Sequence, residues 1–377
     1  MDSPMNNIFP LEPYSGKDSF CDREQEISDI TSLLKNGTNT VLISPRRYGK
    51  TGLILRSFDD LKQNKYTCIY ADIFSAKDMH SLVKILSEAV VSSISEDSLI
   101  KNFFDTIKAV RPLLSFDPIS GTPQVTFNFQ ADSQKQETLK NIFDFLENQP
   151  QKIIFAIDEF QQIRNFKDDN VEAVLRTYIQ HLHNVKFIFC GSKKHMMLDM
   201  FTSAASPFYE SACSIHLDRI PAEKYAPFIK EQFKKGGQDI DEESISFILE
   251  WTKRHTYYTQ LLCNRIFAES HKKIDLATTK SVAAKILRLQ AQDFIEKRNL
   301  ITDNQWDFLQ AVAKEGCVKQ PTAAAFLQKY KLGNASSAKK ITTALVEKEL
   351  LLETTTLEGK SYSVYNVFMS RWMEGLV

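Results

Sequence analysis

The feature that most constrains this chain is an apolar, β-branched run followed by a basic loop with a glycine and then by a helical pattern. The run, residues 41–43, ends at the turn-forming pair Ser44 and Pro45, and the loop leads through Gly49 into a helical pattern over residues 53–61. A loop of this kind directs backbone N–H groups toward its centre above a helix N-terminus. The stretch therefore predicts a strand, a loop and a helix that together bind a polyphosphate.

The loop resembles the Walker A pattern G-x-x-x-x-G-K-[ST], with Ser44 where the first Gly usually stands. In this interpretation Lys50 reaches the β- and γ-phosphates of a nucleotide, and the Thr51 hydroxyl is a ligand of Mg²⁺. The residues expected to contact the nucleotide are Ser44, Arg46, Arg47, Tyr48, Gly49, Lys50, Thr51 and Gly52. Taken alone, the loop has an alternative interpretation as a tight turn that carries a surface lysine.

A second motif follows about a hundred residues later. Five apolar residues, 153–157, predict a strand buried on both faces, and Asp158 and Glu159 come directly after it, where open α/β sheets collect their ligands. We expect Asp158 to hold Mg²⁺, directly or through water, and Glu159 to act as the general base that activates a water molecule. An acidic pair that merely ends a strand is the alternative. The presence of both motifs in one chain favours a catalytic site.

Composition excludes several other classes of protein. Among 377 residues, 47 Lys and Arg balance 47 Asp and Glu, so no overall field draws the chain to DNA or to a membrane surface. The six cysteines form no C-x-x-C pair, which argues against a zinc site and against a disulfide framework. No basic leader opens the sequence, and no apolar run reaches the ~20 residues that span a bilayer. We expect a soluble, cytoplasmic protein without membrane contact.

A resemblance to a known family joins these observations. The segment Phe20-Cys21-Asp22-Arg23-Glu24, followed by the loop, is similar to the "F-x-G-R-E … G-P-R-R-x-G-K-T" opening of archaeal-type ATPases. These belong within or near the STAND and AAA+ groups of P-loop proteins. The resemblance implies that ATP or ADP binds with Mg²⁺ and that Phe20 and Arg23 border the adenine. Asp22 stands where the family has Gly, so the backbone conformation there is left open, and by pattern it is the N-cap of the next helix.

The resemblance also implies an architecture. We expect an α/β P-loop NTPase core of the ASCE type, with a parallel five-stranded sheet, over residues 1–219. Residues 95–150 are too many for a simple connection, and their alternating pattern around Gly121 predicts an inserted helix and hairpin. This insertion is an oligomer contact, a partner-binding element or a plain surface insertion. A helical lid is expected over residues 220–299 and a winged-helix domain over residues 300–377.

Further site residues follow from the resemblance. The strand over residues 185–190 is expected between the strands of the two motifs, with Ser192 at its tip as a sensor of the γ-phosphate, although Gly-Ser is also ordinary turn chemistry. The family has a Gly-Arg pair where this chain has Glu210 and Ser211, so an arginine finger cannot be carried over. Arg219, Arg46 and Arg47 remain as substitutes.

Residues 252–260 resemble the family's "T-x-G-h-P-Y-Y-x-Q" segment in the lid. Arg254 and Thr256 replace its Gly and Pro. Tyr257 is expected to stack on adenine, and the alternative is an aromatic side chain of the core.

The C-terminal residues show the order of a winged helix, with three helical patterns followed by two short strands. Ser336, Ser337, Lys339 and Lys340 are expected on the outer face of the third helix, with Asn334 as its N-cap. Residues 303–374 hold nine Lys and Arg against eight Asp and Glu, a net charge of +1, whereas DNA-reading domains are usually far more basic. Support of the lid or contact with a protein is therefore preferred over DNA binding.

We expect from these features an AAA+/STAND-like, Mg²⁺-dependent ATPase whose hydrolysis is slow without a partner. The first alternative is a nucleotide-gated switch or scaffold that acts through a protein partner or as a homo-oligomer. The second alternative is a DNA-binding regulator or mobile-element helper that uses the winged helix.

Overall fold

The computed structural model describes residues 8–94, 96–107, 110, 112–167 and 170–375. Contacts divide the chain into two compact units, Glu12–Asp218 and the described residues of Met1–Leu11 with Arg219–Val377. The second unit contains both the expected lid and the expected winged helix. The boundaries after residues 219 and 299 therefore stay predictions.

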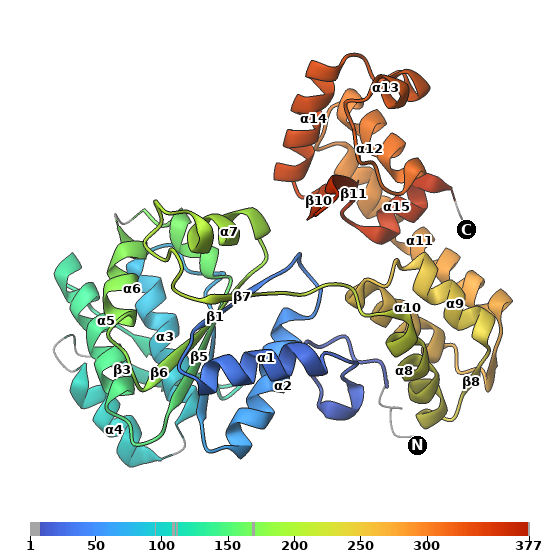
Figure 1. The fold of residues 1–377 in the computed structure, drawn as a ribbon. Coiled ribbons are helices and arrows are strands. Elements are labelled where there is room, and N and C mark those ends of the chain that lie inside the picture. Colours follow the sequence, from blue (N-terminus) through green and yellow to red (C-terminus); the bar gives the residue numbers. More distant parts are fainter. Residues whose placement is uncertain (1–7, 95, 108–109, 111, 168–169, 376–377) are drawn as a thin grey trace. The chain divides into compact units, whose positions relative to one another are not determined.

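The first unit is built on a five-stranded sheet with the order β2-β5-β6-β1-β7, in which every pair of neighbours is parallel (Figure 1). Its strands are β1 (Thr40–Ile43), β2 (Thr67–Asp72), β5 (Ile153–Asp158), β6 (Val185–Gly191) and β7 (Cys213–His216). The predicted parallel five-stranded sheet is confirmed. So is the position of β6 between β1 and β5, which carry the two motifs at their carboxyl ends.

Helices cover both faces of this sheet because successive side chains of a strand point to opposite sides. Ile154 and Ala156 of β5 pack toward α1 (Glu24–Lys35) and α2 (Lys50–Gln63). The neighbouring β5 residues pack into the larger cluster on the other face, which the helices α3 (Met79–Ser93), α5 (Asp132–Glu147), α6 (Val171–Ile179) and α7 (Lys194–Thr202) share. The apolar run before Asp158 is thus buried on both sides, as its sequence predicts.

The insertion between β2 and β5 contains α4 (Asp97–Thr106) and an antiparallel hairpin of β3 (Leu113–Phe116) and β4 (Pro123–Thr126). The predicted helix and hairpin are confirmed. Val125 is fully buried on the inner side of the hairpin, whereas Ile119 at its tip is 96% exposed.

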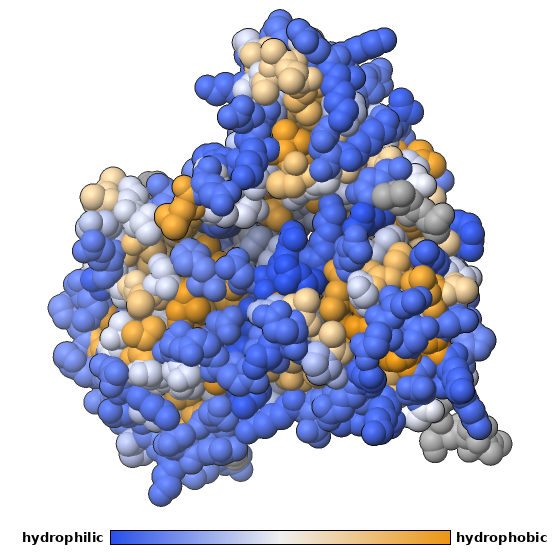
Figure 2. Space-filling model, turned by 45° about the vertical axis from the view of Figure 1, so that its right-hand side comes forward, coloured by the Kyte–Doolittle hydropathy of each residue, from blue (hydrophilic) through white to orange (hydrophobic). Residues whose placement is uncertain are grey.

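Figure 2 shows one face of the molecule as mostly hydrophilic, with its hydrophobic residues in separate groups.

The start of α1 differs from the sequence-based expectation. Asp22 is not the N-cap: that position belongs to Arg23, and neither makes a side-chain cap. Arg23 donates to the Glu26 carboxylate, at 2.6 Å, and to the carbonyl oxygen of Asp218, so a contact far along the chain fixes this turn. Asp22 has a φ of 58°, the left-handed conformation that Gly, the family's residue here, reaches without strain.

The second unit begins with helices and one small parallel pair of strands. These elements are α8 (Ala222–Lys235), β8 (Asp239–Ile240), α9 (Glu242–Trp251), α10 (Thr256–Ala268), β9 (Lys273–Ile274) and the long α11 (Leu276–Arg298). The N-terminal residues join this unit, since the side chains of Asn264 and Gln260 donate to the carbonyl oxygens of Phe9 and Pro10.

The rest of the second unit has the predicted winged-helix order. It contains α12 (Asp303–Glu315), α13 (Ala324–Tyr330), α14 (Ala335–Glu347), β10 (Leu351–Thr356), β11 (Gly359–Val364) and α15 (Val367–Glu374), with β10 and β11 antiparallel. Asn334 caps α14 by accepting a hydrogen bond from Ser337 N at 2.9 Å, as predicted. Ser336, Lys339 and Lys340 are exposed, and Ser337 is half-buried.

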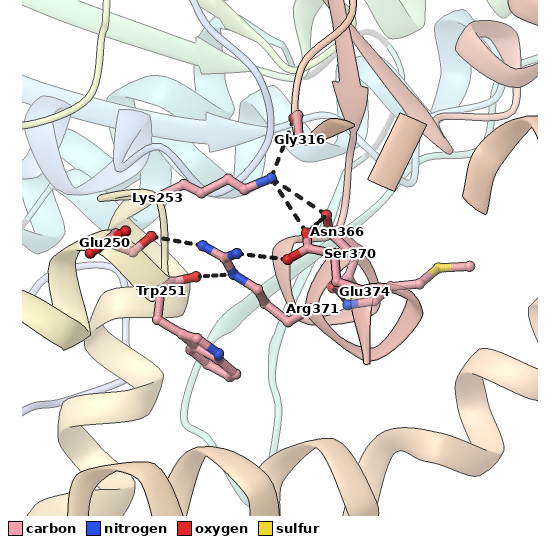
Figure 3. Close-up of polar contacts among 9 residues, drawn as sticks. Glu250, Trp251, Lys253, Gly316, Asn366, Ser370, Arg371 and Glu374 are labelled. Carbon is pink, nitrogen blue, oxygen red and sulfur yellow. Dashed lines mark hydrogen bonds and ion pairs between the residues drawn. The ribbon is translucent and has the colours of Figure 1, made fainter. Parts of the chain in front are cut away.

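A polar cluster joins α15 to the end of α9 (Figure 3). Arg371 donates to the carbonyl oxygens of Trp251 and Glu250 at the C-terminal end of α9, at 2.8 and 2.9 Å. Its guanidinium also pairs with Glu374, at 2.7 Å.

Lys253 reaches the same cluster from the turn after α9. It donates to the carbonyl oxygen of Gly316 and to Ser370 Oγ, each at 3.4 Å, and lies 4.0 Å from Glu374. Burial lowers the pKa of Lys253, and the nearby Glu374 only partly opposes this. Because the folded chain holds this proton less tightly than the unfolded chain, the lysine charge costs stability at neutral pH. The cost disappears as the pH rises through about 10.5.

The two charges should therefore differ in their effect on stability. Glu374→Gln leaves two cations without their carboxylate and is expected to lower the free energy of unfolding by about 3 kcal/mol. Lys253→Met removes a charge that burial disfavours, while Arg371 still pairs with Glu374, and should change it by less than about 1 kcal/mol. Thermal unfolding at pH 7 measures the stability of both variants. A loss of stability in Lys253→Met as large as that in Glu374→Gln would contradict the conclusion that burial disfavours the lysine charge.

Candidate functional site

The loop between β1 and α2 has the geometry of an anion site. Arg47 and Gly49 have φ values of 65° and 94°, so the chain turns sharply before α2 begins at Lys50. The first backbone bond of the helix runs from Leu53 N to the Gly49 carbonyl oxygen at 2.9 Å. The N–H groups before Leu53 have no partner within the helix, and together with the helix dipole they favour a bound phosphate.

Lys50 lies inside this loop and not in open solvent. The residue is only 6% exposed, and its ammonium group donates to the carbonyl oxygens of Ser44 and Pro45, both at 3.0 Å. Ser44 Oγ is a further acceptor at 3.4 Å, so the hydroxyl at the position of the usual Gly takes part in the loop. Phosphate oxygens would replace these acceptors, because an ammonium group bonds more strongly to charged acceptors.

Gly52 is required by packing. A Cβ at this position would lie 2.5 Å from the carbonyl oxygen of Pro13, a distance that real Cβ atoms essentially never show. The N-terminal segment is thus held against α2, and the Tyr14 hydroxyl adds a hydrogen bond to Asp59. The ring of Phe20 packs edge-on against Tyr14, with centroids 5.8 Å apart.

The two sequence motifs meet at Asp158. Oδ2 of this carboxylate accepts from Thr51 Oγ1 at 2.9 Å and from the Tyr70 hydroxyl at 2.8 Å, and Oδ1 accepts from Glu159 N at 2.8 Å. A hydroxyl and a carboxylate side by side are oxygen ligands of the kind that Mg²⁺ prefers. Within the described residues no three His, Cys, Asp or Glu side chains form a metal cluster. The two oxygen donors Thr51 and Asp158 fit an Mg²⁺ ion, which usually keeps several waters and takes phosphate oxygens as further ligands.

Tyr70 was not predicted from the sequence. It lies on β2, which pairs with β5 so that Asp72 is opposite Asp158 and Tyr70 is opposite Ala156. Burial, with the neighbouring Asp158 carboxylate, raises the pKa of Tyr70 well above its ordinary value, so its hydroxyl remains a donor. Only the register of the two strands identifies this residue.

Glu159 and Ser192 also come together, with two further side chains. Ser192 Oγ donates to Glu159 Oε2 at 2.9 Å, and Arg46 Nε donates to Ser192 Oγ at 3.1 Å. Gln161, in the 3-10 helix η3 (Phe160–Asn165), donates to the same Glu159 oxygen at 2.5 Å. The tip of β6, the end of β5 and the loop after β1 thus form one connected polar site, of which the sequence missed Gln161.

The other residues predicted to contact the nucleotide make different contacts within their own units. Tyr48 is buried in the loop, and Arg23 bonds to Glu26 and Asp218. Tyr257 lies in the second unit, where its ring packs edge-on against Tyr258 with centroids 5.3 Å apart. Contact of these residues with a nucleotide stays a prediction, as does a role of Arg219, which also belongs to the second unit.

Comparisons with known proteins show the family of this chain and its fold. Residues 20–259 match the model of a family described as an ATPase domain predominantly from Archaea, and residues 292–375 match that of a probable winged helix domain. Among curated proteins, none matches this sequence significantly. No helix in the described part of the chain combines the length and apolar character needed to cross a membrane.

Solved structures similar to this chain have low sequence identity and therefore show the fold alone. A Walker-type ATPase of Pyrococcus abyssi matches with a TM-score of 0.67 and 19% identity, over 97% of this chain and 99% of that one. The ORC2 protein of Aeropyrum pernix, solved as ADPNP-ADP complexes, matches at 0.57 with 11% identity over 98% of each chain. The ORC1 protein of the same organism, solved in complex with DNA, matches at 0.51 with 12% identity over 98% and 97%.

The bond from Tyr70 to Asp158 can be tested by a double-mutant cycle. Tyr70→Phe removes one donor from a buried carboxylate and should lower the free energy of unfolding by about 1–3 kcal/mol. In an Asp158→Asn background the same change should cost clearly less, because the charged acceptor is gone. Tyr66→Phe, beside the same hydrophobic cluster, is the matched control. Equal costs for Tyr70→Phe in both backgrounds would contradict the assigned contact.

Proposed function

This chain belongs to the family of ATPase domains predominantly from Archaea, and we propose that its site binds ATP with Mg²⁺ and hydrolyses it. The single observation that carries the proposal is the 2.9 Å contact between Thr51 and Asp158. It joins the end of the phosphate-type loop to the end of the second motif at one point. These residues, 107 positions apart in the sequence, form a pair of hard oxygen ligands of the kind that Mg²⁺ prefers.

Each residue of the site has a defined part in this proposal. The Lys50 ammonium group and the N–H groups that begin α2 bind the phosphate oxygens, and Thr51 and Asp158 hold Mg²⁺. When bound, Mg²⁺ neutralises charge on the phosphates. Glu159 accepts a proton from the attacking water, since Ser192 and Gln161 donate only to Oε2 and leave Oε1 for this purpose. The Phe20 segment borders the adenine.

We further propose an AAA+/STAND-like mode of action with slow turnover when the chain is alone. Glu210 and Ser211 stand where the family has a Gly-Arg pair, so no arginine finger can be assigned there. Arg46 is the candidate substitute, because it donates to Ser192, which in turn donates to the Glu159 carboxylate. A protein partner or a second copy would then raise the rate, and ATP and ADP would act as a switch. A cytoplasmic location stays a prediction.

Two substitutions separate binding from hydrolysis. Lys50→Ala should abolish ATP binding, because it removes the cation inside the loop. Glu159→Gln should bind ATP with unchanged affinity and lower kcat by about 10²- to 10⁴-fold, because the proton acceptor is lost. Lys62→Ala, at an exposed position of the same helix, is the control. Calorimetry measures ATP binding, and phosphate release measures the rate of hydrolysis. A Glu159→Gln rate equal to that of the unmodified chain would show that Glu159 is not the base.

DNA binding is a second candidate, favoured by the exposure of Lys339 and Lys340 on α14. Two observations weaken it. The charge of residues 303–374 is only +1, and Lys319 and Lys360 pair with the acidic residues Glu358 and Glu353 of the β10–β11 hairpin. Fluorescence anisotropy with a labelled duplex at about 50 mM salt decides the matter. A DNA-binding domain should show affinity that falls with salt and with Lys339→Ala/Lys340→Ala. Absence of binding at low salt would leave the winged helix as a support or protein contact.

A further inference from the structure

We infer that Gln161 is a positioning residue that holds the Glu159 carboxylate with Oε1 directed to the attacking water. This inference rests on the proposed hydrolysis and adds a residue to it. Gln161 follows Glu159 by two positions and belongs to η3, for which Glu159 is the N-cap. The backbone of Glu159 has a φ of 55°, a left-handed conformation that is uncommon for Glu.

The two donors to the base approach one oxygen only. Ser192 Oγ and Gln161 Nε2 both donate to Oε2 of Glu159, at 2.9 and 2.5 Å. None of the described residues donates a hydrogen bond to Oε1. Two hydrogen bonds to the same oxygen favour one orientation of the carboxylate, in which Oε1 is the atom presented to a water molecule. Fixing a catalytic group in one orientation is a recognised source of rate enhancement.

The surroundings of Gln161 indicate that it is not present for stability. The residue is 2% exposed, and its side-chain carbonyl oxygen Oε1 is buried without a hydrogen-bond partner among the described residues. Leaving a buried acceptor unsatisfied lowers stability, and an apolar side chain of similar shape would avoid this loss. The only side-chain hydrogen bond found for Gln161 in the described chain is the one to Glu159.

Hydrogen bonding decides which end of the Gln161 amide meets the base. A Cβ added at Gly191 would lie 2.1 Å from Gln161 Oε1, so the carbonyl oxygen is held against the backbone at the tip of β6. The reverse orientation would place this oxygen against the Glu159 carboxylate, where two acceptors repel. The N–H₂ group therefore faces the base, and the glycine at position 191 provides the space for this arrangement.

Ser192 links the base to the phosphate loop through Arg46. Gln161 is the partner of Glu159 on the other side and makes no contact with that loop among the hydrogen bonds of the described chain. Loss of Gln161 should therefore disturb the base while nucleotide binding remains intact. A purely structural residue would change stability and binding as well.

The test compares Gln161→Met with Gln162→Met in the full-length chain. Gln162 is the adjacent residue of η3, and it donates to the Ala76 carbonyl oxygen at 3.1 Å, away from the base. Gln161→Met should lower kcat for ATP by at least about tenfold, equivalent to about 1.4 kcal/mol. Its KM should stay within about twofold and its Tm should not fall. Gln162→Met should leave kcat unchanged.

A double variant shows whether Gln161 acts through Glu159. Adding Gln161→Met to Glu159→Gln should cause no further loss of the residual rate, because the group being positioned is already gone. Two results would overturn the inference while the proposed function stands, provided that the unmodified chain hydrolyses ATP. The first is a kcat of Gln161→Met equal to or higher than that of the unmodified chain. The second is a loss of kcat from Gln161→Met that adds to the loss from Glu159→Gln. If the unmodified chain shows no ATP turnover, alone or with added partners, the proposed function fails first and the inference fails with it.

Discussion

The structure of the site depends on one buried carboxylate. Asp158 is 5% exposed, and a polar group so far from water needs hydrogen-bond partners. It obtains them from three segments, since Thr51, Tyr70 and the N–H group of Glu159 all donate to it. This requirement holds the carboxyl ends of β2 and β5 and the start of α2 together. The same concentration of oxygen atoms makes the place suitable for a divalent cation and a triphosphate.

The sequence predicted the elements that carry this centre because their signals are local. The apolar run before Asp158 is long enough to specify a buried strand, and the glycine and lysine at positions 49 and 50 specify a turn into a helix. Tyr70 and Gln161 could not be found in this way. The first depends on the register between β2 and β5, and the second on the left-handed backbone of Glu159. Neither quantity can be read from residue types along the chain.

The wrong assignment of Asp22 as an N-cap has a similar cause. An Asp two residues before a helix is a good local candidate, but Arg23 bonds to the carbonyl oxygen of Asp218, 195 residues later. That contact sets the backbone of the turn. Long-range contacts matter in the second unit too. Arg371 of α15 donates to a carbonyl oxygen in the last turn of α9, and Lys253, in the turn after α9, donates to a side chain of α15. The segment over residues 252–260, which is predicted to approach the adenine of the nucleotide, is therefore attached to the winged helix.

The central claim is that Thr51 and Asp158 bind a cation together with ATP. Calorimetric titration of ATP with and without Mg²⁺, on the unmodified chain and on Asp158→Asn, tests it most directly. The account predicts that Mg²⁺ strengthens ATP binding at least about tenfold in the unmodified chain, about 1.4 kcal/mol, and has little effect in the variant. An equal gain from Mg²⁺ in both proteins would show that the cation is held elsewhere and would contradict the account.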